Sequence, residues 1–209
     1  MKNSDEKNKK ISCVLFDLDG VLVDACEWHF ESLNKALKEI AKIEISRHDH
    51  ETRFNGLPTS VKLKMLKIEE NKIPEIWKLK QNYTKTVIEE NAVICPEKIQ
   101  LLEFLKIQNI KTGCVTNSIR ETAELMLRSS GQISYFDKIV TNEDVVRNKP
   151  FPDCYNFAIE SLCANHRETL CIEDSDKGIE AAKNSFAKYV WEVKGFNEVN
   201  LKNYLEFIK

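Results

Sequence analysis

The chain has 209 residues, of which 42% are hydrophobic and 31% charged, and its formal net charge is −2. These values are typical of a globular protein with one core and room for a small second module. The low net charge excludes a general attraction to nucleic acid, and no apolar run approaches the ~18 residues of a membrane helix. We therefore expect neither nucleic acid nor a membrane as a partner, and nothing in the sequence indicates an oligomeric state.

The cysteine pattern indicates a reducing compartment. The chain has seven cysteines, and they show no CxxC spacing. An odd number without that spacing argues against a disulfide framework or a zinc site. The N-terminal region lacks the uninterrupted apolar segment and cleavage site of a signal peptide. We expect reduced, mostly buried thiols and a cytoplasmic location.

The first predicted element is a strand at residues 11–16. This short, continuous apolar run contains β-branched residues, which is typical of a parallel strand covered on both faces. It leads directly into Asp17-Leu18-Asp19-Gly20. Two carboxylates so close to a buried strand would repel each other unless a positive group lies between them.

A purely helical region follows this strand. Pro58 and Pro74 are suited to the first turn of a helix, and a turn is expected at residues 56–59. Helices are predicted at residues 27–43, 60–70 and 73–90. The sequence therefore predicts a helical cap at residues 25–91, inserted into a core formed by residues 1–24 and 92–209.

Strands and helices alternate over the rest of the chain. Further strands are predicted at residues 110–117, 138–144, 168–175 and 187–193. Helices are predicted at residues 97–108, 120–130, 154–163, 177–185 and 198–209. This alternation is typical of βαβ units. The predicted fold class is α/β, with a Rossmann-like doubly wound parallel sheet as the core and the α-helical cap inserted into it.

Polar motifs follow four of the predicted strands, at the end of a parallel sheet where ligands usually bind. The four motifs begin at Asp17, Thr116, Lys149 and Glu173. Several carboxylates would then meet at one point, and hard oxygen ligands suit Mg²⁺, which also binds water and substrate phosphate. Lys149 would add a second cation, and backbone amides after Thr116 can donate to phosphate oxygens. The motifs thus predict a magnesium and phosphate site.

The same motifs point to a known family. DLDGVLVD, TNS, KPFPD and EDSDKG, in this order and with a helical insertion, resemble the motifs of the haloacid dehalogenase-like (HAD) hydrolase superfamily. The resemblance covers about residues 11–193 and is closest to subfamily I with a small helical cap, which includes β-phosphoglucomutase and phosphoglycolate-type phosphatases. It implies a Mg²⁺-dependent phosphatase that hydrolyses a small phosphomonoester, such as a sugar phosphate, through an aspartyl-phosphate intermediate.

The resemblance also implies residue roles. Asp17 would be the nucleophile and Asp19 the acid and base, for which we expect a raised Asp19 pKa. The metal would be held by the Asp17 carboxylate, the Asp19 backbone carbonyl and Asp174. Glu173 would either bind the metal directly or contact one of its ligands. The implied substrate-binding residues are Thr116, Asn117, Ser118 and Lys149.

Two alternative functions remain at this stage. A sugar phosphomutase of the β-phosphoglucomutase type would need a cap arginine, but Thr59 stands at its position in GLPTSVK. Ile119 likewise replaces a basic residue after the second motif, although Lys62 or Arg120 could compensate. A non-enzymatic, phospho-accepting receiver module would lack both the DxDG motif and an insertion of this size.

Several single residues have two readings. His29 could face the site or pack in the cap, and Lys78 and Lys80 could reach the substrate or be solvated. His48-Asp49-His50 is predicted to be an exposed cap loop rather than a metal site, because further nitrogen or sulfur ligands are missing nearby. Asp24 is predicted to act as a hinge or a helix cap.

Overall fold

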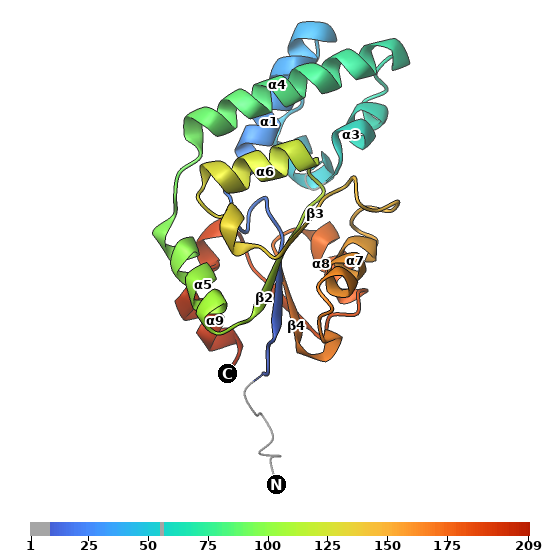
Figure 1. The fold of residues 1–209 in the computed structure, drawn as a ribbon. Coiled ribbons are helices and arrows are strands. Elements are labelled where there is room, and N and C mark those ends of the chain that lie inside the picture. Colours follow the sequence, from blue (N-terminus) through green and yellow to red (C-terminus); the bar gives the residue numbers. More distant parts are fainter. Residues whose placement is uncertain (1–8, 55–56) are drawn as a thin grey trace.

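A computed structural model describes residues 9–54 and 57–209 (Figure 1). It contains a parallel sheet with helices on both faces, and a group of helices beyond one end of the sheet. Gly56, the first residue of the turn predicted at residues 56–59, lies outside the described residues.

Five parallel strands form the sheet in the order β3-β2-β1-β4-β5. Their bounds are β1 Cys13–Phe16, β2 Lys111–Val115, β3 Lys138–Val140, β4 Thr169–Glu173 and β5 Tyr189–Glu192. All five predicted strands are present, each shorter than predicted at one or both ends. The central strand β1 pairs with β2 and β4. The predicted α/β class with a Rossmann-like parallel sheet is confirmed.

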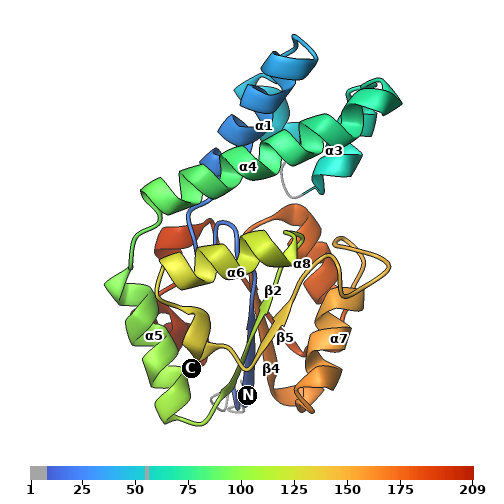
Figure 2. The ribbon, with the colours of Figure 1, turned by 45° about the horizontal axis from the view of Figure 1, so that its top comes forward.

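The two faces of the sheet are covered by different helices (Figures 1 and 2). Val14 and Phe16 pack toward α5 (Pro96–Ile107), α6 (Arg120–Ser129) and α9 (Leu201–Phe207). Cys13 and Leu15 pack toward α7 (Asp153–Ser161) and α8 (Asp176–Lys183). Since successive residues of a strand point to opposite faces, an unbroken apolar strand is the pattern that such two-sided burial requires.

Residues 26–91 form the inserted helices, which lie beyond the carboxyl ends of the strands (Figure 2). Their bounds are α1 Cys26–Ile40, α2 Arg47–Asp49, a π-helix His50–Phe54, α3 Thr59–Met65, a 3₁₀ turn Glu70–Lys72 and α4 Ile73–Asn91. The long helices α1 and α4 pack along each other. They share a hydrophobic cluster of their own, formed by Leu33, Ala36, Leu37, Ile45, Phe54, Leu63 and Ile76.

Three short 3₁₀ turns complete the described elements: Ile133–Tyr135, His166–Glu168 and Phe196–Glu198. All seven cysteines are free, and four of them are buried, in agreement with the predicted thiols. Among the described residues, no helix has the length and apolarity needed to cross a membrane.

One expectation about the inserted region is wrong, and one of the two roles predicted for Asp24 is excluded. The segment His48-Asp49-His50 is helical rather than a loop, and His50 is buried with its ring 4.8 Å from that of Phe30. Apolar packing of the imidazole ring explains this burial. Asp24 does not cap α1, because the N-cap residue of that helix is Ala25 and no side chain caps it, whereas the hinge role of Asp24 stays a prediction.

We expect Phe16→Ala to destabilise the fold by about 3–5 kcal/mol, because it removes a large side chain from a close-packed core. Phe16 is 0% exposed and meets Phe136 edge-on, with 6.1 Å between ring centroids. Urea unfolding measures the loss. Phe186→Ala is the matched control, since Phe186 is 55% exposed. Equal losses in the two variants would contradict the described packing.

Candidate active site

The turn after β1 places Asp17 at the carboxyl edge of the sheet. The Asp17 backbone N–H donates to the carbonyl of Ile172 on β4, at 3.0 Å. Gly20 then adopts φ +85, and a Cβ there would lie 2.0 Å from Asp174 Oδ2. Glycine is therefore required both for the left-handed backbone and for the close approach of Asp174.

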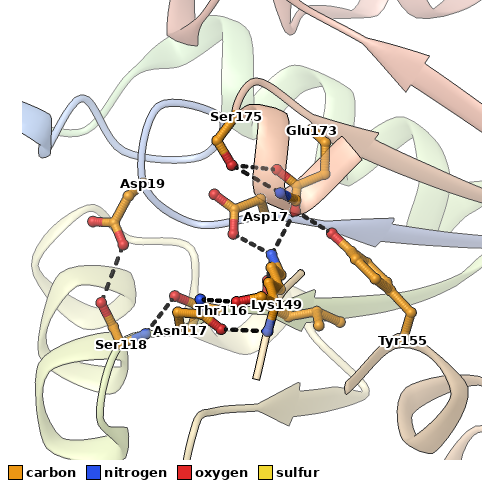
Figure 3. A network of polar contacts seen from close by, with 11 residues as sticks. Asp17, Asp19, Thr116, Asn117, Ser118, Lys149, Tyr155, Glu173 and Ser175 are labelled. Carbon is orange, nitrogen blue, oxygen red and sulfur yellow. Dashed lines mark hydrogen bonds and ion pairs between the residues drawn. The ribbon is translucent and has the colours of Figure 1, made fainter. Parts of the chain in front are cut away.

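Lys149 joins three strand ends (Figure 3). Its ammonium group donates to Asp17 Oδ1 at 2.6 Å, to Glu173 Oε1 at 2.6 Å and to the carbonyl of Val115 at 2.8 Å. The Lys149 side chain is 4% exposed. A single buried cation therefore fixes the positions of two carboxylates that follow different strands.

The residues after β2 fix the surroundings of Lys149 and Asp19. Asn117 Nδ2 donates to the Lys149 carbonyl at 3.2 Å, and Asn117 Oδ1 accepts from the Lys149 N–H at 3.1 Å. Thr116 Oγ1 accepts from the Ser118 N–H at 3.0 Å, and Ser118 Oγ donates to Asp19 Oδ2 at 3.1 Å. Asn117 thus ties the Lys149 loop to the sheet, while Ser118 orients Asp19 (Figure 3).

The carboxylates perturb one another's protonation. Burial, followed by the charge of Glu173, raises the pKa of Asp17 well above its usual value, although Lys149 opposes this. Burial together with Glu173 and Asp19 raises the pKa of Asp174 to about 7. Burial would lower the pKa of Lys149, but Asp17 and Glu173 outweigh it and raise that pKa. The site therefore carries more negative charge than Lys149 alone can balance.

His29 reaches Asp19 from the inserted helices, and Lys80 contacts His29 from behind. His29 Nε2 lies 2.9 Å from Asp19 Oδ1, and Lys80 Nζ lies 3.2 Å from His29 Nδ1. Because a lysine ammonium only donates, His29 Nδ1 must accept and Nε2–H must donate to Asp19. Burial and the charge of Lys80 lower the pKa of His29, with Asp19 opposing them. His29 therefore faces the site and donates to Asp19, so that the site-facing alternative for this residue is correct.

The expected rise in the Asp19 pKa is not found. Burial acts to raise this pKa, but the charge of His29 and hydrogen bonds from His29 and Ser118 outweigh it and lower the Asp19 pKa. The sequence pattern alone contains no information about this pair, because His29 approaches from a helix outside the sheet.

The acidic residues fit a hard divalent cation. Ligand oxygens of Asp17, Glu173 and Asp174 lie within 4.8 Å of one another. Asp174 Oδ1 is buried and has no hydrogen-bond partner in the described structure. An all-carboxylate donor set with an unsatisfied buried oxygen suits Mg²⁺. The Asp19 side chain is outside this group and is held by His29 and Ser118 instead.

Tyr155 is a site residue that the sequence analysis missed. Its hydroxyl donates to Glu173 Oε1 at 2.6 Å, and the residue is fully buried. Lys149 donates to the same oxygen, so Glu173 Oε1 is occupied from two sides (Figure 3). No local pattern marks this residue, because a tyrosine in the first turn of a helix usually packs as an apolar side chain.

A cavity of about 120 Å³ lies between the core residues and the inserted helices. Asp17, Asp19, Thr116 and Lys149 line its core side. The inserted helices contribute His29, His50, Thr59, Lys62 and Lys80 to its lining. Lys80 is buried, whereas Lys78 on the same helix is exposed. The structure thus brings all the predicted site residues to one region and adds side chains from α1, α3 and α4.

We expect Gly178→Ala to destabilise the protein by about 1–3 kcal/mol, because a Cβ would overpack the site. That Cβ would lie 2.1 Å from the Glu173 carboxyl carbon. Helix propensity alone predicts that Gly178→Ala stabilises the protein, since alanine is favoured over glycine by about 1 kcal/mol in a helix. The unfolding temperature of the variant shows whether the substitution destabilises or stabilises the protein. Glu180→Ala, at an exposed position of α8, is the control, and stabilisation by Gly178→Ala would contradict the observed approach.

We expect Lys80→Met to raise the pKa of His29, because the charge of Lys80 is the second largest cause of its lowering. NMR titration of the imidazole resonances measures this pKa. Lys78→Met, at an exposed position of the same helix, should leave it unchanged. A His29 pKa that is the same in both variants would show that Lys80 does not contact the ring in solution.

Comparison with known proteins agrees with this geometry. A family model described as haloacid dehalogenase-like hydrolase matches residues 14–191. A pyrophosphatase PpaX from Bacillus mycoides is 31% identical over 89% of this chain and 86% of its own length. A phosphorylated carbohydrates phosphatase from Thermotoga maritima is 29% identical over 88% of this chain and 85% of its own.

Solved structures show the same architecture. A β-phosphoglucomutase from Clostridium difficile superposes with a TM-score of 0.78 and 25% identity, covering 94% of this chain and 96% of its own. CbbY from Rhodobacter sphaeroides, in complex with phosphate, gives a TM-score of 0.78 at 22% identity, covering 88% and 87%. The fold and the family prediction are confirmed together: the chain belongs to the haloacid dehalogenase-like hydrolases.

Proposed function

We propose that this hydrolase is a Mg²⁺-dependent phosphatase that releases phosphate from a small phosphomonoester through a covalent intermediate on Asp17. The observation that carries the proposal is the position of Asp17. Lys149 holds Oδ1 of this carboxylate, and within the described residues no hydrogen bond is made to Oδ2. Asp17 also lines the cavity, so that Oδ2 is available to attack phosphorus.

The relatives support the class of reaction. Of the two relatives named above, one is a pyrophosphatase and the other a phosphatase, and both names denote hydrolysis at phosphorus. The small cavity favours a compact metabolite, as predicted for a sugar phosphate or a similar substrate. The free thiols agree with the proposed cytoplasmic location.

Asp17 and Asp19 divide the reaction into two displacements. An Asp17 oxygen attacks phosphorus, the bond to the leaving oxygen breaks, and Asp19 gives that oxygen a proton. Water then attacks the aspartyl-phosphate, Asp19 takes its proton, and inorganic phosphate leaves with the Asp17 carboxylate restored. The lowered pKa of Asp19 suits the second step. For the first step, the negative charge of the entering phosphoryl group raises this pKa and favours proton uptake.

The other polar residues bind or orient. Lys149 and Thr116 offer donors to the phosphoryl oxygens, while Asn117 and Ser118 hold Lys149 and Asp19 in place. Asp17 and Asp174 would hold Mg²⁺. Glu173 would not bind the metal directly, because its Oε1 accepts from Lys149 and Tyr155. A bound Mg²⁺ would neutralise the carboxylates and the phosphoryl oxygens together.

We further propose that residues 25–91 form the cap domain and residues 1–24 and 92–209 the core domain. The separate hydrophobic cluster of the inserted helices supports this division. His29 contacts Asp19 from the cap side and Lys80 contacts His29, so the cap helps to enclose the reacting groups and exclude water.

A phosphomutase is the second candidate, since a β-phosphoglucomutase is among the similar structures. Two observations favour hydrolysis. Thr59 lines the cavity where the mutase pattern has arginine, and Arg120 pairs with Asp144 instead, its Nη2 donating to the two carboxylate oxygens at 2.8 and 2.6 Å. Of the two compensating residues considered from the sequence, only Lys62 lines the cavity.

We expect Asp17→Asn to abolish phosphate release, because an amide is a far weaker nucleophile than a carboxylate. A panel of phosphorylated metabolites with added Mg²⁺, and with chelator in place of Mg²⁺, measures the release. Asp24→Asn is the matched control, as Asp24 is exposed. Full activity of Asp17→Asn, or of the wild-type enzyme in chelator, would contradict the proposal.

A further inference from the structure

Tyr155 contacts both members of the buried ion pair between Lys149 and Glu173. Its hydroxyl donates to Glu173 Oε1 at 2.6 Å, and Lys149 Nζ lies 5.0 Å from the centroid of its ring. The ring belongs to the apolar cluster that also contains Leu15 and Val115. Because this packing fixes the ring, it also fixes the direction in which the hydroxyl donates (Figure 3).

Lys149 by itself holds Glu173 less firmly than Tyr155 does. A lysine ammonium has three N–H donors, and here they serve Asp17, Glu173 and the carbonyl of Val115. In the proposed reaction Lys149 also donates to the phosphoryl oxygens, so the substrate competes with Glu173 for this donor. The hydroxyl of Tyr155 has a single proton, and that proton goes to Glu173. Tyr155 therefore keeps Glu173 in place when Lys149 turns to the substrate.

The carboxylate of Glu173 is within reach of the expected metal ligands. One of its oxygens lies within 4.8 Å of ligand oxygens of Asp17 and Asp174. Its Oε2 lies 3.5 Å from Ser175 Oγ, and a Cβ on Gly178 would lie 2.1 Å from either oxygen. Glu173 thus lies against the start of α8, but its distance from the other two carboxylates does not exclude it from the ligand set. What excludes it is the pair of donors on Oε1.

The number of carboxylates at a site influences which cation it prefers. Mg²⁺ binds through one or two carboxylates and keeps several waters, whereas Ca²⁺ takes about six to eight oxygen ligands and accepts further carboxylates. From its contacts we infer that Tyr155 is a positioning residue, which keeps Glu173 from becoming a metal ligand and thereby selects Mg²⁺ over Ca²⁺ at Asp17 and Asp174. The inference rests on the proposed Mg²⁺ dependence and names the residue that determines the choice of cation.

Metal titrations of a matched pair of variants test this inference. Tyr155→Phe keeps the ring and removes the hydroxyl, and calorimetry without substrate measures the Kd values of Mg²⁺ and Ca²⁺. We expect the ratio of the Ca²⁺ Kd to the Mg²⁺ Kd to fall by at least about fivefold, because Glu173 can then bind the larger ion. Tyr204→Phe is the control, since Tyr204 is buried and its hydroxyl has no hydrogen-bond partner in the described part of the chain. An unchanged ratio in Tyr155→Phe, or an equal change in both variants, overturns the inference.

Two further measurements connect the change to Glu173. Glu173→Gln and Tyr155→Phe/Glu173→Gln should have the same ratio, because neither contains a third carboxylate to release; a fall in the double variant as large as in Tyr155→Phe contradicts the inference. Tb³⁺ is a hard ion close to Ca²⁺ in size, and its luminescence decay in H₂O and D₂O counts its bound waters. Tyr155→Phe should hold fewer waters on Tb³⁺ than the wild type, which a merely structural role of Tyr155 would not cause. Circular dichroism checks the fold of each variant.

The titrations separate this inference from the proposed function, because they contain no substrate and require no turnover. A fall of the ratio in Tyr155→Phe supports the role of Tyr155 even if the wild-type enzyme releases no phosphate from any metabolite. An unchanged ratio overturns this role even if the wild-type enzyme is a Mg²⁺-dependent phosphatase. A wild-type protein that binds neither cation overturns both proposals.

Discussion

The ammonium group of Lys149 lies 2.6 Å from both Asp17 and Glu173, and the organisation of the site depends on this contact. The two carboxylates follow neighbouring strands, and without a cation between them they would repel each other in a buried place. Tyr155 fixes Glu173 by donating to its carboxylate, and Asn117 fixes Lys149 by accepting from its backbone N–H. Breaking such a buried pair leaves an uncompensated charge. The contact that positions Asp17 therefore also stabilises the fold.

Lys149 does not balance all the charge at this edge of the sheet. Asp174 retains a buried oxygen without a partner in the described structure, and burial with nearby carboxylates raises its pKa to about 7. The opposite wall of the cavity has the reverse imbalance, with Lys62 and Lys80 buried and unpaired by any described carboxylate. The cavity thus has an acidic floor, which suits a cation, and a basic roof.

The fold and the acidic floor could be predicted because they depend on local pattern and on topology. Apolar runs mark the strands, and parallel strands end at one edge, so that motifs distant in sequence converge. The basic roof could not be predicted in the same way. His50 stands in a polar segment that predicts exposure, yet its ring packs against Phe30. The lowered pKa of Asp19 depends on His29, whose direction is set by the packing of α1 on α4.

The central claim is that Asp17 forms a covalent bond to phosphorus. The direct measurement is mass spectrometry of peptides from a single turnover with Mg²⁺ and substrate, quenched in acid before the intermediate hydrolyses. We predict one added phosphoryl group on the peptide containing Asp17, located on that residue by fragmentation, and none in Asp17→Asn protein. Phosphate release without a modified peptide, or a phosphoryl group on another carboxylate, would contradict the account.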